Sequence, residues 1–168
     1  MTDSLITWFT ETLNFMPKEV VAFIISMVPI LELRGGLVAS SILRIDVLKA
    51  VIICVIGNMI PVPFILLFIT PIFNWMKKTK LFKPMVEKLE KKSMSKSGDI
   101  KKYEFWGLAL FVGIPLPGTG AWTGALIASL LGIEFKKAFL STSLGIVIAA
   151  AIMTFISYGI PWIVNFVV

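Results

Sequence analysis

The sequence contains no histidine, a single cysteine, Cys54, and three aspartates. The missing histidines exclude Ser-His and Cys-His nucleophiles and histidine-based zinc sites, and one cysteine forms no internal disulfide. The aspartates, Asp3, Asp46 and Asp99, all lie outside the apolar segments. The two facing carboxylates of an intramembrane aspartyl protease are therefore absent as well. We expect no catalytic residue, no metal site and no cofactor, and hence a protein that is not an enzyme.

Charge is also absent from three long segments, residues 50–76, 105–133 and 138–168, which contain 27, 29 and 31 residues. About 20 apolar residues are enough to cross a bilayer. The mean hydropathy is +0.91 and 57% of the residues are hydrophobic, compared with roughly 45–50% in soluble domains. The chain is therefore predicted to be an all-α integral membrane protein.

The first apolar segment is interrupted. Residues 20–31 are apolar but are followed by Glu32, Arg34 and the pair Gly35-Gly36, with Pro29 just before them. Two interpretations remain open: one membrane span with an internal charge pair, or a re-entrant hairpin that enters the membrane and returns to the same side. Glycine permits a reversed backbone and proline ends an incoming helix, so the pattern favours the hairpin.

A second interrupted segment occupies residues 105–131. It is uncharged, and its centre contains Pro115, Pro117, Gly118 and Gly120. Irregular backbone at membrane depth is tolerated where it is buried in protein or lines a wet cavity. We therefore expect a second re-entrant hairpin, in which a half-helix beginning near Ala121 directs its free N–H groups at an anion.

The connection between the two halves, residues 77–104, contains ten lysines and four acidic residues. Its net charge of +6 equals the formal charge of the whole chain. A basic helix with one apolar stripe is typical of a membrane surface rich in anionic lipids. Nucleic acid is the other partner that such lysines suggest, but membrane topology accounts for them, so none is expected. A second interfacial amphipathic helix is predicted over residues 1–17.

The two halves align without gaps when the chain is shifted by 88 residues. Eight of the 29 positions from 29 to 57 are then identical. The identical pairs are Pro29 and Pro117, Gly36 and Gly124, Ser41 and Ser129, Leu43 and Leu131, Ile45 and Ile133, Lys49 and Lys137, Ala50 and Ala138, and Gly57 and Gly145. We infer one membrane domain with two repeats, residues 18–76 and 105–168, joined by the basic connection.

Each repeat is predicted to contain one re-entrant hairpin and one transmembrane helix. A hairpin returns to its own side and a span crosses, so the second repeat begins on the opposite side and the repeats are inverted. Inverted repeats whose broken helices meet near the midplane are typical of secondary transporters. The side that holds residues 77–104 and 132–137 carries twelve basic residues against three on the other side. The positive-inside rule places that side in the cytoplasm.

These motifs resemble a known family. Pro-Ile-Leu-Glu-Leu-Arg-Gly-Gly at 29–36 and Gly-Ile-Pro-Leu-Pro-Gly-Thr-Gly-Ala-Trp-Thr-Gly-Ala-Leu-Ile-Ala at 113–128 look like those of the small multidrug export protein family. That family is distantly similar to the DedA/VTT superfamily, which includes lipid scramblases and polyprenyl-phosphate flippases. The resemblance implies two facing re-entrant hairpins, each followed by a transmembrane helix. DedA-type flippases carry arginines around the second hairpin, where this chain has Ile114 and Ala121. Arg34 would therefore be the only cation at membrane depth that could bind a phosphate headgroup.

Glu32 and Arg34 are the leading candidates for a substrate or ion site, because ionisable groups at membrane depth are costly and face a cavity or each other. Glu32 is expected to carry a proton and to pair with Arg34 in the substrate-free state. Arg34 is also expected to bind an anionic group. A purely structural ion pair is the alternative. Close helix packing and a helix kink are the alternatives for the small residues and Asn58. The other candidate residues are Gly35, Gly36, Asn58, Pro117, Gly118, Thr119, Gly120, Trp122 and Thr123.

The sequence thus predicts a secondary transporter, exporter or flippase in a prokaryotic cytoplasmic membrane. Its substrate would be a small amphiphilic or lipid-like molecule, such as a lipid phosphate, and its partners the membrane lipids. Four membrane elements make a thin bundle, so a homodimer is expected. A structural or assembly protein of the membrane, in which both motifs serve only for packing, is the alternative.

Overall fold

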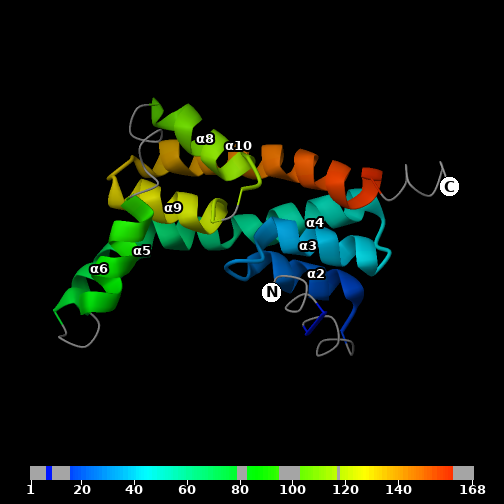
Figure 1. Ribbon diagram of the computed structural model, residues 1–168, viewed down its shortest axis with the longest axis horizontal. Coiled ribbons are helices and arrows are strands. Elements are labelled where there is room, and N and C mark those ends of the chain that lie inside the picture. Colours follow the sequence, from blue (N-terminus) through cyan, green and yellow to red (C-terminus); the bar gives the residue numbers. More distant parts are fainter. Residues whose placement is uncertain (1–6, 9–15, 79–82, 95–102, 117, 161–168) are drawn as a thin grey trace.

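The computed structural model describes residues 7–8, 16–78, 83–94, 103–116 and 118–160. Throughout this part the chain is helical and contains no strand, which confirms the all-α prediction. The interfacial helix predicted over 1–17 and the end of the second repeat, 161–168, lie largely or wholly outside it. The helices are α2 (Lys18–Met27), α3 (Glu32–Ile42), α4 (Val47–Met59), α5 (Pro61–Lys77), α6 (Lys83–Met94), α8 (Phe105–Gly113), α9 (Ala121–Leu130), α10 (Phe135–Thr154) and the π-helical turn η1 (Phe155–Gly159) (Figure 1).

Two apolar helical runs within the described residues are long enough to cross a membrane. Helices α4 and α5 continue into each other as Val47–Met76, and α10 with η1 forms Phe135–Gly159, runs of 30 and 25 residues. At about 1.5 Å per residue both exceed the roughly 30 Å of a bilayer core. Asp46 caps the first run, because its Oδ1 accepts hydrogen bonds from the N–H groups of Leu48 and Lys49 at 3.1 and 3.3 Å. The runs extend in opposite directions in Figure 1.

The remaining apolar helices are short and paired. Helix α2 packs against α3, and α8 contacts α9, and these helices have 10, 11, 9 and 10 residues. None of them alone spans a bilayer core. The pairs lie toward opposite ends of the two long runs in Figure 1. The expected order of helix, turn, helix and long helix is therefore present in each half.

The predicted role of Gly35 and Gly36 in the first turn is wrong. Both glycines lie inside α3, and the chain reverses earlier, between α2 and α3, where Ile30 and Glu32 have φ values of 80° and 49°. Gly36 faces Ser26 of α2, whose hydroxyl a Cβ at position 36 would overlap. The glycine pair therefore allows two helices to approach closely and does not bend the chain.

Left-handed backbone recurs at the 88-residue spacing. Arg44 and Gly132 end corresponding helices, and their N–H groups donate to the carbonyl oxygens of Ser41 and Ser129, each at 3.1 Å. The residues with positive φ in the first half are Ile30 (80°), Glu32 (49°) and Arg44 (52°), and those in the second half are Gly118 (76°), Gly120 (138°) and Gly132 (69°). Each member of the first set is followed 88 residues later by one of the second, so the halves share local geometry as well as sequence.

Helices of each half also pack against helices of the other half. Helix α3 packs against α10 and η1 of the second half, and α9 packs against α5 of the first. The hydroxyl of Ser41 donates to the carbonyl oxygen of Ser157 at 2.7 Å, and the corresponding Ser129 shares a hydrogen bond of 2.8 Å with Thr70. This reciprocal packing brings the turns of the two hairpins together near the middle of the bundle.

Helix α6 is amphipathic, as the sequence predicts. Val86 is buried, and α6 packs against α5 and α9. Lys83, Lys88 and Lys91 are exposed. The basic face of this connection therefore points away from the helix bundle, close to one end of α9.

Candidate functional site

Glu32, at the start of α3, supplies the central contact between the hairpins. Its side chain is 6% exposed. Its Oε2 accepts a hydrogen bond from the N–H of Ala121 at 3.0 Å, and its Oε1 accepts one from the N–H of Trp122 at 3.1 Å. These N–H groups begin α9, where helical N–H groups lack partners within the helix and the helix dipole favours a negative charge. Glu32 thus caps a helix that begins 89 residues later.

Gly120 provides the space for this cap. It precedes α9, has a φ of 138° and offers no side-chain cap of its own. A Cβ at position 120 would overlap the carboxylate of Glu32. Gly120 is also the residue that corresponds to Glu32 at the 88-residue spacing. The glutamate of one hairpin therefore occupies the place left empty at the same position of the other.

Arg34 binds the other side of the second turn. Its Nη1 donates to the carbonyl oxygen of Leu116 at 2.7 Å. Its Nη2 donates to the carbonyl oxygen of Ile114 at 3.2 Å and to Oγ1 of Thr119 at 2.9 Å. These three acceptors are uncharged. The guanidinium group therefore holds the turn in shape while its charge is not cancelled by the groups that it contacts.

Glu32 and Arg34 do not form the direct pair that the sequence suggested. No ion pair within 4.0 Å joins them among the described residues, although Arg34 still exerts a favourable electrostatic effect on the carboxylate. Residues two apart on a helix do not face each other. Each charged group consequently binds a different part of the second hairpin, and both join it to the first.

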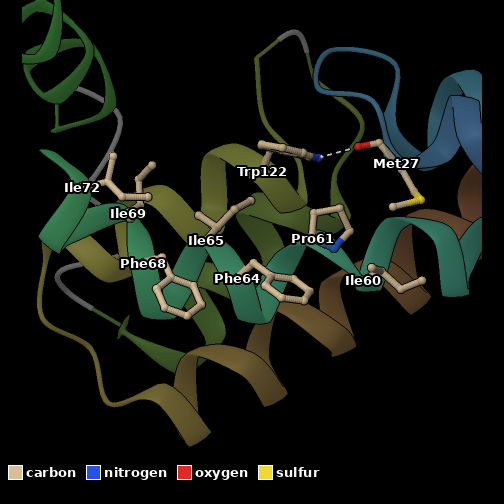
Figure 2. A pocket seen from close by; sticks show the side chains of 9 residues that line it. All are labelled: Met27, Ile60, Pro61, Phe64, Ile65, Phe68, Ile69, Ile72 and Trp122. Carbon is tan, nitrogen blue, oxygen red and sulfur yellow. Dashed lines mark hydrogen bonds between the residues drawn. The ribbon is translucent and has the colours of Figure 1, made fainter. Parts of the chain in front are cut away.

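We call the contacts of Glu32 and Arg34 with the second turn and the start of α9 the joint. Trp122 connects this joint to an apolar hollow. Its backbone N–H binds Glu32, and its ring Nε1 donates to the carbonyl oxygen of Met27 at 3.2 Å. Figure 2 shows Trp122 and its hydrogen bond to Met27 on one side of the hollow and side chains of α5 on the other. The hollow has a volume of about 530 Å³. It is lined by Met27, Ile60, Pro61, Phe64, Ile65, Phe68, Ile69, Ile72 and Trp122. We call it the α5 hollow.

A second hollow, of about 480 Å³, lies along α8 and reaches the turn that Arg34 binds. The two hollows have no described lining residue in common. Trp122, which binds Glu32, lines the α5 hollow, whereas Thr119, which binds Arg34, lines this second one. The lining residues are Tyr103, Trp106, Gly107, Leu110, Phe111, Ile114, Leu116 and Thr119. We call it the α8 hollow.

The other predicted site residues lie in several places. Gly35 packs against Leu31, and Gly36 against Ser26, so neither lines a hollow. Asn58 is buried in α4, and its Oδ1 has no hydrogen-bond partner within the described structure. Gly118 and Thr123 flank the joint in the second turn and in the first turn of α9. Pro117 lies outside the described residues.

The sequence prediction missed the carbonyl oxygens of Met27, Ile114 and Leu116. Backbone groups carry no signal of their own in a sequence, but two of these precede prolines, Pro115 and Pro117. A residue before proline is driven toward extended backbone, which exposes its carbonyl group. Ile114 has this conformation, with φ −80° and ψ 122°. The Pro-x-Pro spacing was thus the available signal for the acceptors of Arg34.

The fold and the joint define a helical integral membrane protein whose two hairpins are held together by a buried glutamate and an arginine. The model of the family described as "Putative small multi-drug export protein" matches residues 32–152, well over half of the chain. The chain belongs to this family, as its motifs predicted. The match begins at Glu32 itself and includes the whole second turn. No curated protein and no solved structure matches the chain.

Proposed function

We propose that the protein is a secondary transporter, acting as an exporter or flippase for a small amphiphilic or lipid-like molecule, and not an enzyme. One observation carries this proposal: a buried carboxylate joins the two hairpins at Trp122, which also lines an apolar hollow of about 530 Å³. Buried ionisable groups within a membrane bundle mark substrate or ion pathways. A mostly apolar hollow beside a few convergent polar groups is the usual form of a small-molecule site.

The proposed membrane arrangement is an inverted repeat with two re-entrant hairpins. Three observations support it: the short paired helices, the opposite directions of the long runs, and the left-handed positions that recur after 88 residues. The lysine-rich connection faces the cytoplasm of a prokaryotic cell, where α6 lies on anionic lipids. A homodimer is the proposed assembly, since the bundle is thin.

Glu32 is the proposed proton carrier. As a carboxylate it accepts two hydrogen bonds from the start of α9, and the helix dipole stabilises its charge. As a neutral acid it loses that charge, and one of its oxygens becomes a donor facing N–H groups. Protonation therefore weakens the joint. Trp122 then moves relative to Met27, which opens the end of the α5 hollow and couples proton binding to movement of the hairpins.

The test is transport in proteoliposomes with an NBD-labelled lysophospholipid as substrate, measured from pH 5.5 to 8.5. Glu32→Gln keeps the size of the side chain but removes the titration, so we expect a folded protein whose transport rate no longer changes with pH. The matched control is Glu134→Gln, because Glu134 is an exposed acid outside the joint. This control should retain the wild-type profile. Size-exclusion chromatography establishes that both variants remain folded.

A wild-type pH profile in Glu32→Gln would show that the glutamate is structural and that proton coupling is wrong. Absence of transport by the wild-type protein itself would favour the alternative function, a structural or assembly protein. The close contacts of Gly36 and Gly120 are what such a packing role requires. Transport by the wild-type protein decides between the two functions before any variant is compared.

A further inference from the structure

No carboxylate contacts the guanidinium group of Arg34 directly within the described structure. Its three hydrogen bonds go to two carbonyl oxygens and a hydroxyl. Among the described residues no carboxylate lies within 4.0 Å of it, since Glu32 binds the start of α9 instead. The guanidinium group has five N–H donors, and these contacts use three of them. A half-buried cation with unused donors in an apolar bundle is stabilised when it binds an anion.

The α8 hollow begins where this cation is held. Ile114, Leu116 and Thr119 accept the hydrogen bonds of Arg34 and also form one end of the hollow. The other end is formed by Tyr103 and Trp106, at the start of α8, beside the lysine-rich connection. The hollow therefore runs from an aromatic end at the start of α8 to the turn that Arg34 binds.

The walls of the α8 hollow suit a hydrocarbon chain. Trp106, Leu110 and Leu116 are between 50% and 63% exposed. Large apolar side chains that stay exposed on a membrane bundle face lipid, so the hollow opens toward the hydrocarbon of the bilayer. Its volume of about 480 Å³ lies within the range of small-molecule sites.

We infer that the α8 hollow binds an amphiphile with a single anionic headgroup, whose head lies on Arg34 and whose chain lies along α8. This inference rests on the proposed function and names its substrate class. Charge complementarity selects the ligand, because a cationic head would be repelled by Arg34 and an uncharged head would form no ion pair with it. Thr119 orients the guanidinium through its Oγ1, and the described contacts leave two of its five N–H donors for the headgroup.

The experiment uses tryptophan quenching by brominated amphiphiles, with the purified protein in nanodiscs of zwitterionic lipid. The probes are 12-bromododecyl phosphate and 12-bromododecyl trimethylammonium, which differ only in the headgroup. Trp106 lines the α8 hollow and Trp122 the α5 hollow, so Trp106→Phe and Trp122→Phe identify where quenching arises. We expect the phosphate to quench at about tenfold lower concentration than the ammonium probe, and Trp106→Phe to remove this difference.

Arg34→Ala should abolish the headgroup preference, and Arg34→Lys should retain part of it. Lys49→Ala, which removes an exposed cation at the start of α4, should leave it unchanged. Equal quenching by both probes in the wild-type protein overturns the inference, and this comparison requires no variant to fold. A preference that persists in folded Arg34→Ala, or that disappears in Trp122→Phe and not in Trp106→Phe, overturns it as well.

Transport measurements separate this inference from the proposed function. Proteoliposomes are assayed with an NBD-labelled lysophosphatidic acid and with the cationic dye ethidium. We expect transport of the anionic lipid. Transport of ethidium alone, with a pH profile that depends on Glu32, would overturn the headgroup assignment and leave the transporter intact. Phosphate binding at Trp106 with no transport of any compound would support the site and contradict the proposed transport.

Discussion

At the scale of single residues, Glu32 and Gly120 form a complementary pair. The carboxylate needs the space that a missing side chain leaves, and the start of α9 needs the carboxylate because Gly120 provides no cap. Neither residue achieves this alone. The pair therefore fixes the distance between the two hairpins as well as the charge at their joint.

Gly120→Ala should destabilise the protein by more than its backbone strain explains. The new Cβ would overlap the Glu32 carboxylate and break its hydrogen bonds to α9. We expect a loss of about 2–4 kcal/mol, measured by thermal unfolding in detergent. Gly132→Ala is the matched control, because Gly132 also has a positive φ but nothing lies within 4 Å of the added atom. It should cost only about 1 kcal/mol.

Double variants with Glu32→Ala complete this test. If the overlap causes the loss, Gly120→Ala should cost no more than Gly132→Ala once the carboxylate is removed. Equal costs of the two glycine substitutions in the wild-type protein would contradict the steric role of Gly120. The coupling between the two positions is the difference between the cost of Gly120→Ala in the wild-type protein and its cost in Glu32→Ala.

The sequence pointed to the charged members of the joint and to Thr119 and Trp122, but not to the main-chain groups that Glu32 and Arg34 bind. Glu32 and Arg34 are conspicuous because they interrupt an apolar segment. Apart from Oγ1 of Thr119, their partners are main-chain groups of Ile114, Leu116, Ala121 and Trp122, which carry no signal in the sequence. The prediction that an anion would sit at the start of α9 located the site, but it did not identify the anion as a side chain of the same protein.

At the scale of secondary-structure elements, the crossing of α8 with α10 depends on small residues. Gly145 of α10 lies against α8, where an added Cβ would be 2.6 Å from Cβ of Val112 and 2.7 Å from the carbonyl oxygen of Ala109. Gly113 of α8 lies against Ile148 in turn. Because helix association in membranes relies on close packing, these glycines set the distance between the two helices.

Gly145→Ala should therefore separate α8 from α10 and lower stability by about 1–3 kcal/mol. The measurement is again thermal unfolding in detergent. Val147→Leu serves as the control, because Val147 is on the same helix but 56% exposed, and it should change stability by less than about 0.5 kcal/mol. A neutral Gly145→Ala would mean that the helices move apart without loss, and the crossing would then contribute little to the fold.

The sequence predicted which segments are helical, but it did not predict correctly where the first hairpin turns. Long uncharged segments predict helices because a membrane leaves few other options. The glycine pair at 35–36 was assigned to a turn, since glycine permits reversal, yet tertiary packing against Ser26 uses it inside a helix. The actual turn includes Ile30 with φ 80°, a conformation that its sequence gives no reason to expect.

At the scale of the whole molecule, the proposed inverted arrangement would place corresponding positions on opposite sides of the membrane. Leu48 and Lys136 are 88 residues apart and both exposed near the start of a long run. Single cysteines at these positions, in a Cys54→Ala background, should react with a membrane-impermeant maleimide from opposite sides of sealed vesicles. Cys54 is buried, and its replacement leaves the introduced cysteine as the one thiol of each variant. Labelling of both positions from the same side would contradict the inverted arrangement.

The correspondence of Glu32 with Gly120 also means that the two halves cannot be identical at this position. Two glutamates would each occupy the space that the other requires, and two glycines would leave the start of α9 without its carboxylate cap. The two halves share their backbone pattern, whereas the buried carboxylate belongs to one of them alone. The repeated halves therefore give the molecule a chemistry that is not symmetric.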